Sequence, residues 1–89
     1  MILYNIVDKG ALLMLEIGKL IRKIRIENGL QQIQIAKILG TTQQHYASYE
    51  NGKHELPIRH LVTLCKFYNV SFDYILGLKQ GEDTLRWKL

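Results

Sequence analysis

One stretch constrains the fold more than any other part of this chain: residues 31–52, QQIQIAKILGTTQQHYASYENG. It contains two short runs with helical spacing, 32–39 and 43–50. Gly40 between them suits a turn with positive φ, because glycine has no Cβ to clash there. The Thr42 hydroxyl can accept an N–H group that the first turn of the second helix leaves unpaired. The stretch therefore predicts two short helices that share one core across a tight turn.

The two predicted helices each have an inner and an outer face. Apolar or small residues recur inward at Ile35, Ala36, Leu39, Tyr46 and Tyr49. The second helix then turns four residues outward: Gln43, Gln44, Ala47 and Ser48. This arrangement is typical of a helix-turn-helix, whose second helix lies in the major groove of DNA. A glutamine amide can bond adenine N6 and N7 together, so the pattern also favours A·T base pairs.

Residues within and around this motif also match the sequence pattern of a known family: Arg25, Gly29-Leu30, Gln32, Ala36, Gly40 to Gln44, Glu50 to Lys53, Pro57, Val70-Ser71 and Ile75-Leu76. With them, roughly residues 17–77 resemble the Cro/repressor-type (XRE-like) helix-turn-helix proteins, which include lambdoid phage repressors. Three residues depart from the family pattern: Ile33, Thr41 and Tyr46. The resemblance implies an all-α, five-helix lambda-repressor-like DNA-binding domain.

The motif and the resemblance together supply candidate DNA contacts. The residues expected at base edges are Gln43, Gln44, His45 and Ser48. Those expected at phosphates are Gln31, Gln32, Thr42, Asn51, Lys53 and Arg59, since helix N-termini favour anions and the family uses the loop after the second helix for phosphate contact. The resemblance also implies an ion pair between Arg25 and Glu50. The alternative for the glutamines is an ordinary solvated surface, and His45 can equally be a spectator.

Three more helices are expected around the motif. The first covers 14–28, where apolar residues recur at helical spacing. The fourth starts at Pro57 and ends near Asn69, and the fifth is capped by Ser71 and ended by Gly77. The inner stripe expected on the fourth helix is Leu61, Leu64, Cys65 and Tyr68.

We predict a DNA-binding domain over 14–78, with an N-terminal extension over 1–13 and a C-terminal tail over 79–89. Two interpretations of the extension remain open. In one, Asp8 caps a longer first helix. In the other, a ribosome-binding sequence encoded just upstream marks Met14 as the natural start, and the extension is not translated.

Composition limits the classes of function. The net charge of +4 and the pI near 9.3 suit a polyanionic partner. The single cysteine, Cys65, permits no disulfide within the chain and is expected to fill the core. The sequence has no metal-like histidine spacing, no nucleophile–base pair, no phosphate-cradling glycine loop and no apolar run of about 18–20 residues. We therefore expect neither an enzyme nor a cofactor, metal or membrane span, and a cytoplasmic location.

The leading hypothesis is a sequence-specific transcriptional regulator, a repressor that binds a palindromic operator in double-stranded DNA as a homodimer. The dimer is expected to form through the fifth helix and the tail, which contains Trp87. The alternative is an antitoxin or adaptor whose main task is to bind a partner protein. Its supporting features are the apolar extension, the tail and Ile33 on a surface expected to be polar.

Overall fold

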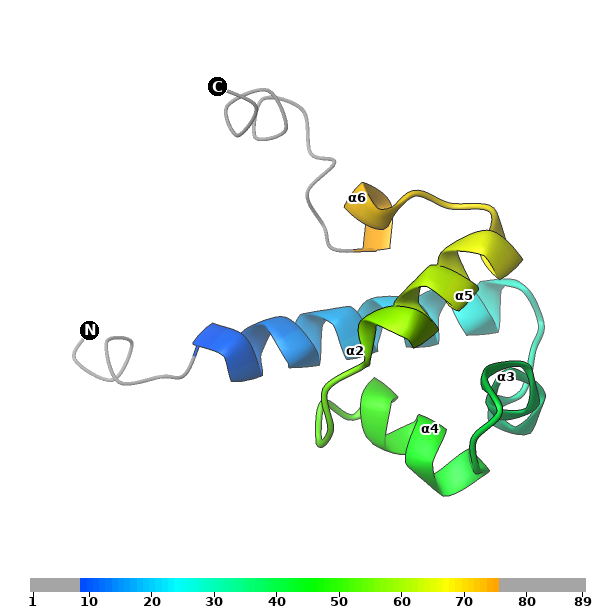
Figure 1. The fold of residues 1–89 in the computed structure, drawn as a ribbon, viewed down its shortest axis with the longest axis horizontal. Helices are drawn as coiled ribbons and strands as arrows, with labels where there is room; N and C mark the ends of the chain where they lie inside the picture. Colours follow the sequence, from blue (N-terminus) through cyan, green and yellow to red (C-terminus); the bar gives the residue numbers. More distant parts are fainter. Residues whose placement is uncertain (1–8, 76–89) are drawn as a thin grey trace. The chain divides into compact units, whose positions relative to one another are not determined.

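The computed structural model describes residues 9–75, in which five α-helices and no β-strand occur. The predicted all-α class is therefore confirmed for this part of the chain. The chain divides into two compact units at Leu56 and Pro57. The helices of the first unit are α2 (Lys9–Glu27), α3 (Gln32–Leu39) and α4 (Gln43–Glu50), and those of the second are α5 (Ile58–Tyr68) and α6 (Phe72–Ile75) (Figure 1).

The bounds of α3 and α4 coincide with the two helices that the sequence predicts. Gly40 ends α3 in the left-handed region, with φ of 72°. Thr42 then caps α4, because its Oγ1 accepts the His45 N–H at 3.1 Å. Gly52, with φ of 74°, follows the end of α4. The turn residues, rather than the helix interiors, define both helices.

Helix α2 is longer than the helix expected over 14–28, since it runs from Lys9 to Glu27. Residues 11–16, ALLMLE, are strong helix formers, so nothing stops the helix at Met14. Leu12 and Leu13 on this added part are 41% and 49% exposed. Asp8, the expected cap of the longer helix, lies outside the described residues. Translation from Met14 and the predicted domain limits stay predictions.

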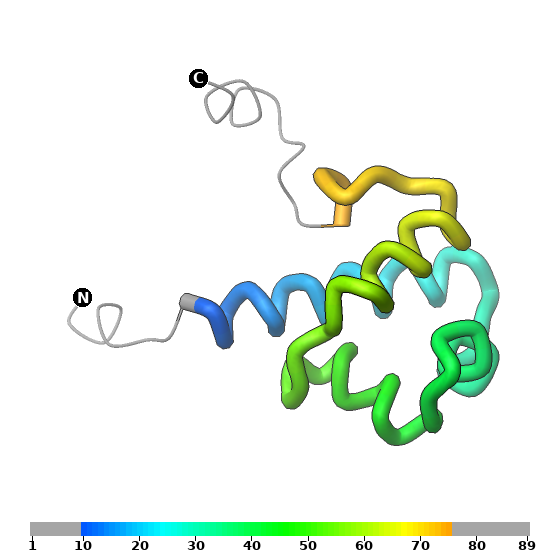
Figure 2. The backbone as a smooth tube through the Cα atoms, viewed as in Figure 1, coloured from blue at the N-terminus to red at the C-terminus, as the bar shows by residue number. Residues whose placement is uncertain are grey.

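In the first unit, α4 packs against both α2 and α3, and the tube in Figure 2 traces how the chain turns from one helix into the next. The buried apolar residues of this unit come from all three helices: Ile21, Ile24, Ile35, Ala36, Leu39, Tyr46 and Tyr49. Gly18 is the point of closest approach. A Cβ there would lie 2.5 Å from the Tyr49 carbonyl oxygen and 2.6 Å from that of Glu50.

The second unit contains α5 and the single turn of α6. Pro57 precedes α5 in the N-cap position, and Asn69 ends it in the left-handed region, with φ of 58°. The Ser71 hydroxyl accepts the Tyr74 N–H at 3.1 Å, which caps α6 as expected. The helix end expected at Gly77 and the tail over 79–89 lie outside the described residues.

The inner stripe expected on α5 is buried to different depths. Leu61 and Leu64 are buried, whereas Cys65 and Tyr68 are half-buried. Burial raises the pKa of the Cys65 thiol, so the neutral form is favoured. This environment suits a packing residue and not a reactive thiolate.

Candidate nucleic-acid interface

The N-terminal half of α4 carries the polar side chains that the sequence assigns to base contact. Gln43, Gln44 and His45 are all exposed. Gln44 makes no side-chain hydrogen bond with any other residue of the described chain, so its amide is free to pair with an incoming group. The helix, QQHYASYE, contains no lysine or arginine. Its exposed end therefore offers amide and imidazole hydrogen bonding in place of positive charge.

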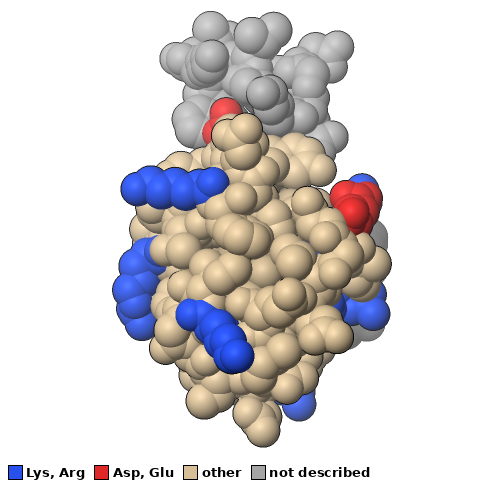
Figure 3. All heavy atoms as spheres, turned by 90° about the vertical axis from the view of Figure 1, so that its right-hand side faces the viewer, with Lys and Arg blue, Asp and Glu red and all other residues tan. Residues whose placement is uncertain are grey.

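Positive charge is not concentrated at one place on the face that Figure 3 shows. On the face shown in Figure 3, lysine and arginine side chains stand apart from one another on a surface that is mostly uncharged. Lys19 pairs with Glu16 at 3.9 Å and Lys23 with Glu27 at 4.0 Å, all four with exposed side chains. The face in Figure 3 therefore carries no single dense basic patch.

Ser48 corrects one prediction. The sequence puts it on the outer face of α4, but it is only 9% exposed. Its backbone oxygen accepts the N–H groups of Lys53 and His54 at 2.9 and 3.3 Å, so the following loop folds over it. Its Oγ donates to the carbonyl oxygen of His45. The hydroxyl is thus used inside the helix, and the exposed base-reading candidates are reduced to Gln43, Gln44 and His45.

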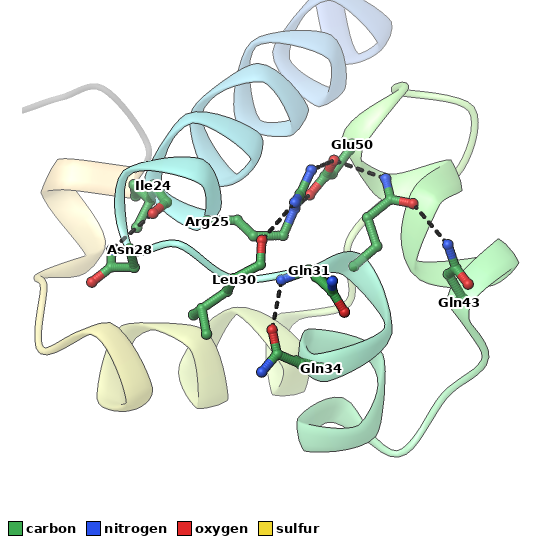
Figure 4. Close-up of polar contacts among 9 residues, drawn as sticks. Ile24, Arg25, Asn28, Leu30, Gln31, Gln34, Gln43 and Glu50 are labelled. Carbon is green, nitrogen blue, oxygen red and sulfur yellow. Dashed lines mark hydrogen bonds and ion pairs between the residues drawn. The ribbon is translucent and has the colours of Figure 1, made fainter.

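A buried ion pair fixes the other half of α4. Arg25 Nε lies 2.7 Å from Glu50 Oε2 and Nη2 lies 3.1 Å from Oε1, so the pair expected between these two residues is present and bidentate (Figure 4). Arg25 Nη1 also donates to the Leu30 carbonyl oxygen at 2.9 Å. One side chain therefore joins α2, the segment before α3, and the end of α4.

Electrostatics favours the charged form of both partners. The hydrogen bond with Glu50 raises the pKa of Arg25 above its ordinary value, outweighing the effect of burial. Burial works to raise the pKa of Glu50, but hydrogen bonds from Arg25, Tyr46 and Gln32 lower it below its ordinary value. A buried pair with this many partners is costly to break on one side only.

Gln32 connects this pair to the exposed end of α4. Its Nε2 donates to Glu50 Oε1 at 3.1 Å, and its Oε1 accepts from Gln43 Nε2 at 3.4 Å. The side chain is half-buried. The sequence predicts a phosphate contact for Gln32. It does not reveal the hydrogen bonds of Gln32 with Glu50 and Gln43. Because the bonded residues are 18 and 11 positions away, no helical period could indicate the contacts.

The first turn of α3 uses its own amide cap. Gln31 is exposed, and its N–H donates to Gln34 Oε1 at 2.7 Å. A Gln three residues after the cap position is a known sequence signature of this arrangement, so Gln34 could have been found from the pattern. The backbone N–H groups of Gln32 and Ile33 remain without an intrahelical acceptor, as in any first turn.

The loop after α4 carries further phosphate candidates. Asn51 and Lys53 are exposed, and the main chain of Lys53 is held to Ser48. Arg59 is exposed on the first turn of α5, in the second unit. The first unit thus contains all of the candidates except Arg59: the turn residue Thr42, the start of α3, the start of α4 and this loop.

His54 is a residue of this loop that the sequence does not single out. Its ring stacks on that of His45, with centroids 5.4 Å apart and planes at 24°. His45 also meets Tyr49 edge-on, with ring centroids 5.1 Å apart and planes at 84°.

No group of three or more potential metal ligands occurs among the described residues. Within the same residues, no helix has the length and apolarity needed to cross a membrane.

Comparison with known proteins identifies similar sequences. A family model described as helix-turn-helix matches residues 21–75. The chain is 36% identical over 63 residues to the uncharacterized HTH-type transcriptional regulator YobD of Bacillus subtilis (strain 168), which covers 71% of this chain and 56% of that protein. It is 37% identical over 59 residues to the SPbeta prophage-derived uncharacterized HTH-type transcriptional regulator YonR of the same strain, covering 66% and 55%.

A third relative has a different description. The chain is 33% identical over 61 residues to antitoxin PezA of Streptococcus pneumoniae serotype 4 (strain ATCC BAA-334 / TIGR4), covering 68% of this chain and 39% of that protein. The chain thus spans little more than half the length of the two Bacillus relatives and less of the third. No solved structure has significant similarity to it.

Proposed function

This chain belongs to the Cro/repressor-type (XRE-like) helix-turn-helix family, and on that premise we propose that it is a sequence-specific repressor of transcription. The observation that carries the proposal is the exposed N-terminal end of α4, where Gln43, Gln44 and His45 follow directly on the turn. In a helix-turn-helix this end of the second helix meets the base edges in the major groove. Two adjacent glutamines there favour A·T base pairs.

The phosphate contacts are proposed on both sides of this reading end. The unpaired backbone N–H groups at the start of α3 and the exposed Gln31 and Thr42 suit one phosphate group. Asn51 and Lys53 of the loop suit another phosphate, and Arg59, which belongs to the second unit, is proposed separately as a phosphate contact. Gln32 is proposed to contact a phosphate and also to support the base-reading end of α4, because its Oε1 accepts a hydrogen bond from Gln43. Such contacts set register and affinity, whereas base contacts set sequence preference.

We further propose a homodimer on a palindromic operator. Two copies of α4 placed about 34–36 Å apart would read half-sites separated by one turn of DNA. Repression would follow from occupation of the promoter by the dimer. The experiment for this part is analytical ultracentrifugation of the full chain with and without a palindromic duplex, where a two-to-one complex is expected. A one-to-one complex on a palindrome would contradict it.

DNA recognition is tested by fluorescence anisotropy with duplexes from the region upstream of its own gene, with a scrambled duplex as competitor and a series of salt concentrations. Gln44→Ala should lose roughly 1–3 kcal/mol of preference for the specific duplex while keeping the salt slope. The matched variant is Lys53→Ala, which should bind all duplexes more weakly, keep the preference, and lower the salt slope by about one. Equal binding of every duplex by wild type would refute sequence recognition.

A second candidate function is that of an antitoxin, favoured by the similarity to antitoxin PezA and by Ile33, which is 42% exposed on α3. Here the main task would be to bind a partner protein through an apolar surface. Coexpression with the protein encoded beside its gene provides the test. Rescue of growth by wild type, lost in Ile33→Glu while DNA binding is unchanged, would favour this function. If growth is the same with and without the chain, it is excluded.

A further inference from the structure

The ring of His45 contacts two aromatic neighbours although the residue is exposed. Tyr49, one turn later on α4, meets it edge-on at 5.1 Å. His54, from the loop after α4, stacks on its face at 5.4 Å and 24°. An exposed imidazole on a helix ordinarily samples several rotamers. Here the contacts with Tyr49 and His54 restrict that freedom.

The stacking residue is itself anchored by the backbone. The N–H of His54 donates to the Ser48 carbonyl oxygen at 3.3 Å, and the N–H of Lys53 donates to the same oxygen at 2.9 Å. Gly52 makes this return possible, since its φ of 74° lies in the left-handed region. The loop therefore returns to α4 in a defined conformation that sets His54 on His45.

The orientation of an imidazole decides what it can read. In the neutral ring one nitrogen donates and the other accepts, and they lie on different edges. An adenine, a guanine and a cytosine each present different donors and acceptors in the major groove. If the ring of His45 is fixed, one edge faces outward and one pattern is preferred. If it rotates freely, both edges become available and the preference is lost.

We propose that His54 is a positioning residue which holds His45 in a single orientation and so makes His45 a determinant of base specificity. The ligand is the major-groove edge of one base pair in double-stranded DNA. This proposal rests on the proposed function above. It assigns a role in base recognition to His54, a residue of the loop after α4. The loop is otherwise expected to contact only phosphate, through Asn51 and Lys53.

The experiment uses the full chain and synthetic duplexes: the sequence that wild type selects from a random pool, and every single base-pair change of it. Discrimination is the ratio of the dissociation constants for the selected and the changed duplex. The base pair read by His45 is the one at which His45→Ala loses discrimination. At that pair, His54→Ala should reduce discrimination by about three- to tenfold, with other pairs and the salt slope unchanged.

Two further variants separate positioning from other roles. His54→Phe keeps a ring that can stack and should restore discrimination to near the wild-type ratio. In the His45→Ala background, His54→Ala should have no further effect at that base pair, because the two residues act as one unit. In the free chain, His54→Ala should also shift the ring-proton resonances of His45, since the ring current of the neighbour is removed.

Several outcomes would overturn the proposal. Equal weakening of all duplexes by His54→Ala, with a smaller salt slope, would make His54 a phosphate contact. A loss of discrimination that persists in the His45→Ala background, or that Phe does not restore, would also exclude positioning through the stack. If His45→Ala changes discrimination at no base pair, His45 reads none. The outcomes above overturn only this proposal. If wild type selects no sequence from the pool, the proposed function fails as well, so the two kinds of failure can be told apart.

Discussion

The two halves of α4 differ in burial and in what holds them. Its first half presents exposed Gln43, Gln44 and His45, whereas the second half buries Tyr49 at 3% exposure and Glu50 at 5%. The exposed half is kept in place by a cap and by side-chain contacts at its edge. The buried half is kept in place by an ion pair and by close backbone packing on α2. A single eight-residue helix thus combines an exposed polar end with a buried end that the ion pair ties to α2.

The anchor and the surface are not independent. The Gln32 amide lies between them, bonded to Glu50 on one side and to Gln43 on the other. A short helix has little stability of its own, so its exposed end depends on tertiary contacts for its position. The comparison therefore predicts that damage to the buried half should reach the exposed half, whereas the reverse effect should be small.

The largest effect is expected from Glu50→Ala. It leaves Arg25, a residue that is 9% exposed, without its carboxylate partner, and removal of one partner of such a pair costs about 3–5 kcal/mol. The free energy of unfolding, measured by urea denaturation, should fall by that amount. The matched control is Glu55→Ala at an exposed position, which should change it by less than about 0.5 kcal/mol. A loss no greater than that of the control would mean that the ion pair is not the anchor.

Gly18→Ala should have the next largest effect. The added Cβ would meet the carbonyl oxygens of Tyr49 and Glu50 at 2.5 and 2.6 Å, and both are backbone atoms that cannot rotate away. We expect a loss of about 1–3 kcal/mol from overpacking, although alanine is the better helix former. Lys19→Ala on the exposed side of the same helix is the control, for which near-neutral stability is expected. Unchanged stability of Gly18→Ala would show that α2 and α4 can shift apart enough to admit a methyl group at no cost.

The sequence was informative where local signals decide and uninformative where distant residues meet. Gly40 and Thr42 predicted the bounds of α3 and α4, because turn and cap geometry needs particular residue types. The burial of Ser48 was missed, since helical spacing does not reveal a loop that folds back over the helix. The contacts of Gln32 with Glu50 and Gln43, and of His54 with His45, were not predicted for the same physical reason, because they join residues of different elements.

The start of α2 illustrates a different limit. Periodicity marks the residues that are buried in the core, and Leu12 and Leu13 stay 41% and 49% exposed in the described part of the chain. Propensity alone carries the helix back to Lys9, and a boundary at Met14 could not be distinguished from it by the pattern. Among the site residues, the Arg25–Glu50 pair came from the resemblance, since the two residues are 25 positions apart.

Acid should weaken the anchor more than the surface. The pKa of Glu50 in the folded chain is lowered from its ordinary 4.5, so its carboxylate adds stability above that value and loses it as the pH falls through the folded pKa. Denaturation at a series of pH values below 4.5 should show a steeper loss for wild type than for Glu50→Gln. The stability that wild type loses in acid should be smaller than the stability lost through Glu50→Ala, because a protonated Glu50 keeps its shape and can still hydrogen-bond. If stability falls in parallel for wild type and Glu50→Gln as the pH is lowered, Glu50 is not the group responsible for the loss of stability in acid.

Thr42→Ala should have the smallest effect on stability and the most local one. It removes the hydroxyl that accepts the His45 N–H at 3.1 Å, at a cost of about 1 kcal/mol for the loss of an N-cap. Hydrogen exchange should then be faster at the amides of the first turn of α4 and unchanged at those of Tyr49 and Glu50, which the ion pair and α2 still hold. Thr42→Ser keeps the acceptor and should match wild type. Equal acceleration along the whole helix would mean that the two halves of α4 open together and that the buried end does not anchor the exposed one.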